Sequence, residues 1–335
     1  MNKKQFGCIM VLMVVLLCGS VICNFVLLAM HGSHVLGETS LITQRAPRFD
    51  ETTVEDGTGP GKIAQVTLRG IITSSESGTL GETMVDDVKI QLRQAAADSD
   101  VKAIVLYVDS PGGEVTASDM IYAAVCNARI QKPVVVYMGS LAASGGYYVS
   151  CGGSYLMADD TSLTGSIGVI IETFNYESLL GKVGLQSIVF KSGQFKDMLN
   201  GARQMTPEEK AYVQEMVMQT YGKFVGIVAR ERKIPEDQLR AGIADGRVIS
   251  GRDALNDKLI DGLGQIEDAY QKAREMGKAP DAPVVRYEAS FQFGKLLRLF
   301  GGRSEASKVQ IELPGTAMPH LEAGRLYLLP SFFAP

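Results

Sequence analysis

Histidine is scarce in this sequence, and its scarcity limits the chemistry that the protein can perform. Among 335 residues there are three histidines, His31, His34 and His320, and no tryptophan. The first two follow an apolar N-terminal stretch and the third lies near the C-terminus, so none falls in the body of the chain. A Ser-His-Asp triad therefore has no suitable histidine, and a histidine-rich metal site is excluded for the same reason.

Cysteines are few and are not arranged in pairs. The five cysteines, at positions 8, 18, 23, 126 and 151, show no paired short spacing. We therefore expect neither a disulfide framework nor a metal centre. Cys151 is expected to be a buried thiol, and the alternative is a disulfide with Cys126 in an oxidising compartment.

Long basic runs and a phosphate-binding loop are also missing. The formal net charge is −4 and no basic run exceeds two residues, which argues against nucleic acid as a partner. The sequence DGTGPGK superficially suggests a phosphate loop, but Asp56 stands where its first glycine belongs and Ile63 where Ser or Thr is needed. We expect no ATP and no cofactor.

The sequence does contain one long stretch without charge, at its start. Residues 6–30 are long enough to cross the ~30 Å hydrocarbon layer of a membrane as a helix. Lys3 and Lys4 precede this stretch and Arg45 is the first basic residue beyond it, so the positive-inside rule places the N-terminus in the cytoplasm and the rest outside. The alternative is a signal peptide cleaved near Ser20.

The next part of the chain alternates between strand and helix patterns. Runs of β-branched and aliphatic residues predict strands at 62–73, 103–109 and 133–138. Amphipathic helices are predicted between them, at about 82–97 and 114–130. Such alternation is typical of an α/β fold with a parallel sheet.

The chain is organised around a turn of small residues, SLAASGGYYVSCGG, at 140–153. Ser144 lies at its apex, preceded by two alanines and followed by Gly145 and Gly146. Small side chains let a peptide approach the hydroxyl, and the backbone N–H groups can point at the atom that Ser144 attacks. We therefore expect Ser144 to be a nucleophile, with the Gly145 N–H as an oxyanion donor.

A serine hydroxyl is a poor nucleophile unless a base takes its proton. Without histidine, a neutral lysine is the usual remaining base. Lys196 is our candidate, because Phe195 and Met198 lie close to it in the sequence and partial burial favours the neutral amine. Lys191 lies nearby, and spacing alone does not choose between the two lysines.

A second glycine turn, SPGG at 110–113, follows the strand predicted at 103–109. Open α/β sheets bind ligands at the carboxyl ends of their strands. The N–H groups of Gly112 and Gly113 are therefore candidate oxyanion donors, and the alternative is an ordinary Pro-Gly-Gly turn.

Further strands around a turn are predicted at 163–172 and 185–190. They would bring Thr164 and Ser166 into the same region, where their hydroxyls could orient Lys196. The alternative is that these hydroxyls are bonded to the backbone, as is common. A long helix is then predicted to begin after Thr206.

With these residues in place, the sequence resembles the signal peptide peptidase A family in its short, single-copy bacterial form. The resemblance covers about residues 62–275, and the motifs are specific together. They are SPGG at 110–113, MGSLAASGGYY at 138–148, LTGSIGVI at 163–170, KSGQFKD at 191–197 and ADGRVISGRDA at 244–254.

The resemblance implies a serine protease of the Clp and crotonase fold group. It implies Ser144 as the nucleophile, Lys196 rather than Lys191 as the general base, Ser166 as the hydroxyl that orients the lysine, and Gly113 as an oxyanion donor. The expected organisation is an anchor at 1–30, a linker at 31–61, a protease domain at 62–275 and a C-terminal extension at 276–335.

The same resemblance implies a location and partners. We expect a single-pass protein of the inner (cytoplasmic) membrane, with its catalytic domain outside the cytoplasm. The expected substrates are apolar peptides such as the signal peptide remnants left in the membrane. Related short forms assemble as rings, so a homo-oligomer is expected.

Three alternatives remain open at this point. A same-fold membrane protease that cuts specific membrane proteins would use identical chemistry. A crotonase-like acyl-CoA enzyme would share the fold, but a serine in the turn and a membrane anchor disfavour it. An inactive scaffold is disfavoured because Ser144 and Lys196 are both retained.

Overall fold

The computed structural model describes residues 49–75 and 83–288, together with Met13, Leu17, Gly19, Ser20, Tyr327 and Leu328. The chain divides into two units, Met1–Ala46 and Pro47–Pro335. In the first unit the four described residues are helical. The rest of the span predicted at 6–30 lies outside the described residues. Among the residues that are described, no helix is long and apolar enough to cross a membrane.

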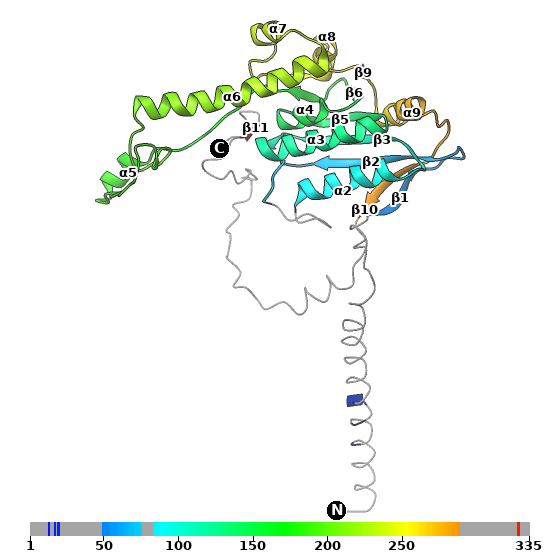
Figure 1. Ribbon diagram of the computed structural model, residues 1–335, viewed down its shortest axis with the longest axis horizontal. Helices are drawn as coiled ribbons and strands as arrows, with labels where there is room; N and C mark the ends of the chain where they lie inside the picture. Colours follow the sequence, from blue (N-terminus) through cyan, green and yellow to red (C-terminus); the bar gives the residue numbers. More distant parts are fainter. Residues whose placement is uncertain are drawn as a thin grey trace, which may run out of the picture. The chain divides into compact units, whose positions relative to one another are not determined.

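A mostly parallel sheet of nine described strands is the centre of the second unit (Figure 1). The strands are β1 (Asp50–Glu55), β2 (Lys62–Arg69), β3 (Val101–Ser110), β5 (Val134–Ala143), β6 (Tyr155–Ala158), β7 (Leu163–Gly165), β8 (Val248–Ser250), β9 (Gly262–Leu263) and β10 (Val284–Glu288). The main path runs β1-β10-β2-β3-β5-β6-β9, and β7 pairs with both β5 and β8. Only the pairs β1–β10 and β7–β8 of this sheet are antiparallel.

Helices cover both faces of this sheet. They are α2 (Met84–Ala97), α3 (Val115–Gln131), α4 (Gly145–Ser150), α5 (Glu177–Lys182), α6 (Pro207–Arg232), α7 (Glu236–Ala241), α8 (Gly251–Asn256) and α9 (Ile266–Gly277). Side chains of α2, α3, α4 and α6 share one apolar cluster, and side chains of α9 belong to a second. The sequence-based prediction of an α/β fold with a parallel sheet is therefore confirmed.

The central strand β3 shows why these segments form strands. Ile104 and Leu106 point into the first cluster, whereas Ala103 and Val105 point into the second, with Tyr270 of α9. All four β3 residues are fully buried. A strand that is buried on both faces has a nearly continuous apolar sequence, as is typical of parallel sheets covered by helices.

The sheet extends beyond the range predicted for the protease domain, 62–275. Strand β1 falls in the predicted linker, and β10 falls in the predicted C-terminal extension. The two strands pair antiparallel, and β10 joins the sheet through β2. The sequence of β1, DETTVE, is mostly polar and exposed, so no hydrophobic pattern marks it as a strand.

The long helix predicted to begin after Thr206 is confirmed as α6. The Thr206 hydroxyl accepts a hydrogen bond from the Glu209 N–H at 3.2 Å, and the Glu209 carboxylate accepts one from the Thr206 N–H at 2.9 Å. This reciprocal capping box satisfies two donors that a helix start otherwise leaves free. Pro207 occupies the first turn, where the missing N–H costs nothing.

Residues 171–205, which we call the arm, differ from the prediction. The strand predicted at 163–172 is limited to β7, and the strand predicted at 185–190 is wrong, because those residues form no strand. Leu185, Ile188 and Phe190 are instead 63%, 74% and 97% exposed. Figure 1 shows the arm, with α5 near its end, projecting from the sheet beside the N-terminal part of α6.

Candidate active site

Ser144 lies at the junction of β5 and α4 in a backbone conformation that is rare for a residue with a side chain. Its φ is 52° and its ψ is −111°, outside the regions that L-residues favour. Strain of this kind is concentrated at functional sites. The residue is fully buried, and its Oγ has no hydrogen-bond partner among the described residues. A buried hydroxyl without a partner is costly and calls for an explanation.

The position of Ser144 follows from β5, which is longer than predicted. The first half of β5 pairs with β6, and its second half pairs with β7. The Ser144 N–H continues the second pairing, because it donates to the Gly165 carbonyl at 2.8 Å. Helix α4 begins at the next residue, and a Cβ on Gly146 would lie 2.7 Å from the Ser110 carbonyl oxygen. Only small residues fit this turn, as its sequence indicated.

The second glycine turn lies directly against this junction. A Cβ on Gly112, whose φ is +100°, would lie 2.5 Å from the Gly145 nitrogen. A Cβ on Gly145 would lie 3.1 Å from the Gly113 nitrogen. The structure therefore brings Ser144 and the N–H groups of Gly113 and Gly145 into one small region, as the sequence predicted.

Ile72 fixes the direction of the Gly113 N–H. The Ile72 N–H donates to the Gly112 carbonyl at 2.8 Å, and its carbonyl accepts from the Glu114 N–H at 2.8 Å. Groups alternate between the two edges of an extended strand, so the Gly113 N–H faces the opposite edge, away from Ile72. A Cβ on Gly113 would lie 2.0 Å from the Ile72 carbonyl oxygen, which requires glycine here.

A short segment from the C-terminal part of the chain occupies that opposite edge. Strand β11 (Tyr327–Leu328) pairs antiparallel with β4 (Gly113–Glu114), with Leu328 opposite Gly113. Leu328 is fully buried, and its carbonyl oxygen lies 2.0 Å from the position that a Cβ on Gly112 would take. A main-chain carbonyl of an extended apolar segment thus lies next to the Gly145 nitrogen.

The two hydroxyls predicted near the site differ in their surroundings. The Thr164 hydroxyl donates to the Ala142 carbonyl at 2.7 Å, which is the backbone-bonded alternative. Ser166 has φ 51° and is 3% exposed, and its N–H donates to the Arg247 carbonyl at 2.7 Å. It directly follows Gly165, whose carbonyl accepts the Ser144 N–H, so the β5–β7 pairing brings it near the nucleophile in space.

The structure does not bring Lys196 to Ser144. Lys196 is exposed on the arm, and because the Ser144 Oγ has no partner, the lysine amine is not within hydrogen-bond distance of it. The expectation that neighbouring side chains partly bury Lys196 is wrong for the single chain. Phe195 is 40% exposed, and its ring packs against Tyr212 with 5.4 Å between centroids.

The arm is held in place by hydrogen bonds between its own two ends. The Tyr176 N–H donates to the Gly201 carbonyl at 2.8 Å, and the Asn175 side chain donates to the Arg203 carbonyl at 2.8 Å. These bonds close the arm into a loop of its own, and Lys196 lies within that loop.

Lys191, the rival candidate for the base, is already paired. Its amine lies 2.7 Å from Asp197, which also accepts a hydrogen bond from Arg203 at 2.7 Å. Hydrogen bonds from Arg203 and then Lys191 hold the pKa of the Asp197 carboxyl well below its usual range. Asp197 therefore faces Lys191 and Arg203 rather than Lys196.

Two features of the site were missed by the sequence analysis. Glu114 is 7% exposed directly after Gly113, and its position behind the SPGG turn was the available signal. Leu328 and Tyr327 belong to a region without a clear pattern. Their signal was the short apolar run LYLL, which by itself is too common to predict a strand.

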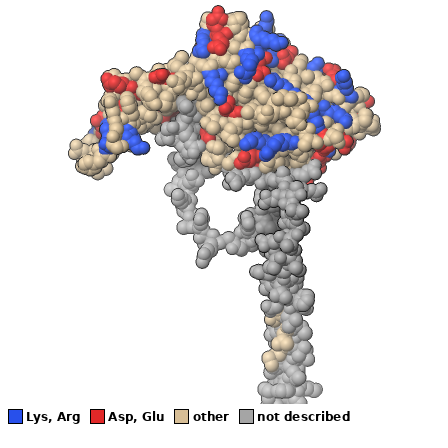
Figure 2. Space-filling view, in the orientation of Figure 1, with Lys and Arg blue, Asp and Glu red and all other residues tan. Residues whose placement is uncertain are grey.

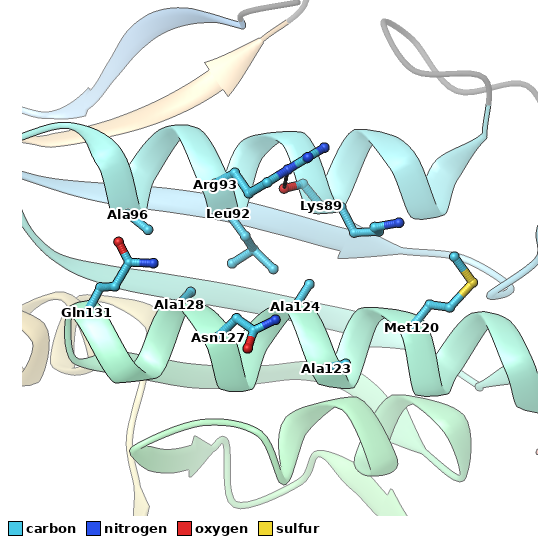
Figure 3. A pocket seen from close by; sticks show the side chains of 10 residues that line it. All are labelled: Lys89, Leu92, Arg93, Ala96, Met120, Ala123, Ala124, Asn127, Ala128 and Gln131. Carbon is cyan, nitrogen blue, oxygen red and sulfur yellow. Dashed lines mark hydrogen bonds between the residues drawn. The ribbon is translucent and has the colours of Figure 1, made fainter. Parts of the chain in front are cut away.

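Other candidate sites lie apart from Ser144. A groove of about 330 Å³ between α2 and α3 (Figure 3) is lined by Leu92, Met120 and neighbouring residues, none of them a predicted site residue. Cys126 and Cys151 are free thiols. Burial raises the pKa of Cys151 to about 12, so it is the inert buried thiol that we expected.

Comparison with known proteins gives consistent matches over this region. The model of peptidase family S49 matches residues 127–279, and the Clp protease model matches residues 65–159. A protein of Enterococcus faecium named as a signal peptide peptidase SppA is 35% identical over 244 residues, which cover 71% of this chain and 70% of the relative. A Synechocystis protease is 36% identical over 221 residues, which cover 66% of this chain and 76% of the relative.

A longer relative matches over only part of its length. Protease 4 of Salmonella typhi is 39% identical over 219 residues, which cover 65% of this chain but 35% of the relative. Ser144 and Lys196 both fall within the residues matched by the S49 family model. The geometry around Ser144 and the extent of these matches agree, and the chain belongs to peptidase family S49 as a serine peptidase.

Proposed function

We propose that this peptidase cleaves extended apolar peptides, among them the remnants of cleaved signal peptides, with Ser144 as nucleophile and Lys196 as general base. The observation that carries the proposal is the buried Ser144 Oγ, which has no partner among the described residues, at a junction where the Gly113 turn lies directly against Gly145. A nucleophile without a partner, next to backbone N–H groups that can stabilise an oxyanion, is the arrangement that acyl transfer needs.

In this proposal the reaction follows two steps. Ser144 Oγ attacks the carbonyl carbon of the peptide bond while the neutral Lys196 amine takes the hydroxyl proton. The Gly113 and Gly145 N–H groups stabilise the negative charge that develops on the carbonyl oxygen. The lysine then gives its proton to the leaving amine, and the acyl-enzyme is hydrolysed by a water that the same lysine deprotonates. Ser166 is the proposed orienting hydroxyl.

The position of β11 supports extended apolar peptides as substrates. It pairs with β4 as an added strand, with its Leu328 side chain fully buried. Strand addition binds any sequence through the main chain, and pockets for alternate side chains then give specificity. The name of the Enterococcus relative adds signal peptides as the substrate class. A peptide-library digest read by mass spectrometry tests this, and cleavage mainly after charged residues would contradict it.

We propose further that Lys196 serves Ser144 of a second copy in a homo-oligomeric ring. Lys196 is exposed, and among the described residues it forms no ion pair. It lies on an arm whose apolar side chains are exposed. In Figure 2 the far end of the arm is largely uncharged, whereas acidic and basic side chains are interspersed over the rest of the visible face. Apolar surface of this kind marks a protein contact.

The charge-free stretch at 6–30 supports a membrane anchor, with the catalytic unit outside the cytoplasm. The test is fractionation of cells that express the full chain or a chain starting at residue 31. We expect the full chain to stay in the membrane pellet after a carbonate wash and the shortened chain to leave it. Release of both chains by carbonate would contradict the anchor.

Labelling with a fluorophosphonate tests the nucleophile and separates this function from an acyl-CoA hydratase. We expect one phosphonyl group on Ser144 of the full-length protein, seen by peptide mapping, and no label on Ser144→Ala. Peptide cleavage should be lost with the label. An unlabelled wild-type protein, or cleavage by Ser144→Ala, would contradict the proposed function.

A further inference from the structure

Glu114 is a buried carboxylate directly after the proposed oxyanion donor Gly113, and the reaction proposed above does not use it. It follows Gly113 in β4 and is 7% exposed. Burying a carboxylate is costly unless hydrogen bonds compensate it. Its bonds therefore show what this residue holds in place.

The Glu114 side chain binds Thr73 and Ser74, the two residues that follow Ile72. One carboxylate oxygen accepts from the Thr73 hydroxyl at 3.0 Å, and the other accepts from the Ser74 hydroxyl at 2.6 Å and from the Ser74 N–H at 3.3 Å. The Thr73 hydroxyl also lies 2.8 Å from that of Ser75. Several short bonds to one carboxylate make a rigid junction.

The main chain of the same two segments is joined next to this junction. Ile72 is bonded through its N–H to Gly112 and through its carbonyl to Glu114. Gly113 is thus held between two main-chain bonds, and the Glu114 carboxylate locks the segment that supplies both of them. The other edge of β4 carries the Gly113 N–H, and there β11 pairs with β4, with Leu328 opposite Gly113.

We propose that Glu114 is a positioning residue that sets the direction of the Gly113 N–H in the oxyanion hole. This inference rests on the proposed function, because it concerns the same site. An oxyanion donor must lie about 2.7–3.1 Å from the position that the charged oxygen takes in the transition state. A small shift of β4 relative to Ile72 weakens that bond while the substrate strand still pairs along β4.

The test compares Glu114→Gln with the wild type in a steady-state peptide assay on the full chain. The amide carries no charge and presents an N–H₂ group where one carboxylate oxygen now accepts, so the charge-assisted bonds of the junction are weakened. We expect kcat to fall about 10- to 100-fold with KM changed by less than about twofold, because the lost interaction exists mainly in the transition state. A peptide aldehyde, which forms a tetrahedral adduct with the serine, should lose affinity by the same factor as kcat/KM.

Glu231→Gln is the matched control. Glu231 is also a partly buried carboxylate, and it accepts hydrogen bonds from Tyr122 at 2.7 Å and Arg129 at 2.9 Å between α6 and α3. We expect this variant to lose thermal stability but to keep kcat and the aldehyde affinity. An equal loss of kcat in both variants would show that Glu114 acts only through stability, and this would overturn the inference.

Ser74→Ala supplies a second, milder test that leaves the carboxylate in place and remains informative if Glu114→Gln does not fold. We expect a several-fold loss of kcat, and no further loss when both substitutions are combined, because the two residues act as one unit. Losses of kcat that add up in the double variant would overturn the inference, and so would an unchanged kcat in both Ser74→Ala and a folded Glu114→Gln. A different result, peptide cleavage by Ser144→Ala, would contradict the proposed function.

Discussion

Gly113 has no space for a side chain, and this makes it a sharp probe of the oxyanion hole. A Cβ there would lie 2.0 Å from the Ile72 carbonyl oxygen, so β4 must move away from Ile72. We expect Gly113→Ala to lower kcat/KM at least about 100-fold, comparable to the loss of one oxyanion donor. The free energy of unfolding should fall by about 1–3 kcal/mol, the usual cost of an overpacked site.

Gly222→Ala is the control for this substitution. Gly222 lies within α6, and a Cβ there would meet only an Arg240 nitrogen at 3.8 Å. Alanine favours a helix interior over glycine by roughly 0.5–1 kcal/mol, so this variant should be fully active and slightly more stable. Both variants are measured by peptide cleavage and by urea unfolding. A fully active Gly113→Ala would rule out the Gly113 N–H as an essential donor.

The residues of the nucleophile turn could be predicted because small side chains and missing histidines are visible in the sequence. The structure places Ser144, Gly113 and Gly145 together as predicted. The surroundings of Lys196 could not be predicted in the same way. Flanking apolar residues such as Phe195 suggest burial, but whether they face the chain's own core or another surface depends on tertiary contacts that no local pattern encodes.

At the scale of elements, a charged cluster fixes the base of the arm to the start of α6. Arg203 donates to Asp197 at 2.7 Å and to Glu209 at 2.9 Å. Hydrogen bonds from Arg203 lower the pKa of Glu209 to about 2, and the pKa of Asp197 is also held well below its usual range. Glu209 is 1% exposed, so this cluster joins the capping box to the arm.

The pKa shifts predict how this junction responds to pH. Unfolded Asp and Glu have pKa values of about 3.9 and 4.3, which are higher than those in the folded protein. The cluster therefore contributes its full stability above about pH 5 and loses it as the pH falls toward about 2. We expect Arg203→Ala to lower the Tm at pH 7, and the difference from the wild type to shrink between pH 5 and pH 3.

Arg252→Ala provides a comparison for the Arg203 variant. Arg252 pairs with Asp160, and both side chains are largely exposed. Exposed pairs contribute little to stability, so its Tm should match that of the wild type at each pH. If the Tm difference between Arg203→Ala and the wild type stayed constant from pH 7 to pH 3, protonation of Asp197 and Glu209 would not weaken this cluster. That result would contradict the prediction.

Elements with a buried, apolar face were predictable, and those without one were not. The strands around 62–69, 103–109 and 134–138 follow from runs of β-branched residues, and α6 follows from its cap. Strand β1 has mostly polar residues, so its pairing with β10 leaves no hydrophobic pattern. The opposite error occurred at 185–190, where an apolar run forms exposed surface instead of a strand.

At the scale of the whole molecule, the arm carries apolar surface that a contact between copies would bury. Phe190 is 97% exposed at this surface. We expect Phe190→Asp to reduce the assembly to smaller species in analytical ultracentrifugation and to lower activity in parallel. Ile130→Asp, at an 82% exposed position in α3, should change neither. An assembled but inactive Phe190→Asp would point to a role in substrate binding instead.

Mixing two inactive variants tests whether the two catalytic residues come from different copies. Ser144→Ala lacks the nucleophile, and Lys196→Arg lacks a base because a guanidinium stays protonated in proteins. In a ring with the dyad between neighbours, some sites pair an intact serine with an intact lysine. Random co-assembly at equal amounts should restore about a quarter of the wild-type sites, because both neighbours must contribute the intact residue.

The experiment is done by co-expressing the two variants with different tags and isolating particles that carry both. Lys191→Arg is the matched control, because an arginine can keep the ion pair with Asp197, and this variant should be active alone. If each chain instead folded its own Lys196 onto its own Ser144, every site in a mixed particle would lack one residue. Mixed particles without activity would therefore contradict the shared dyad, whereas restored cleavage could arise only from contact between copies.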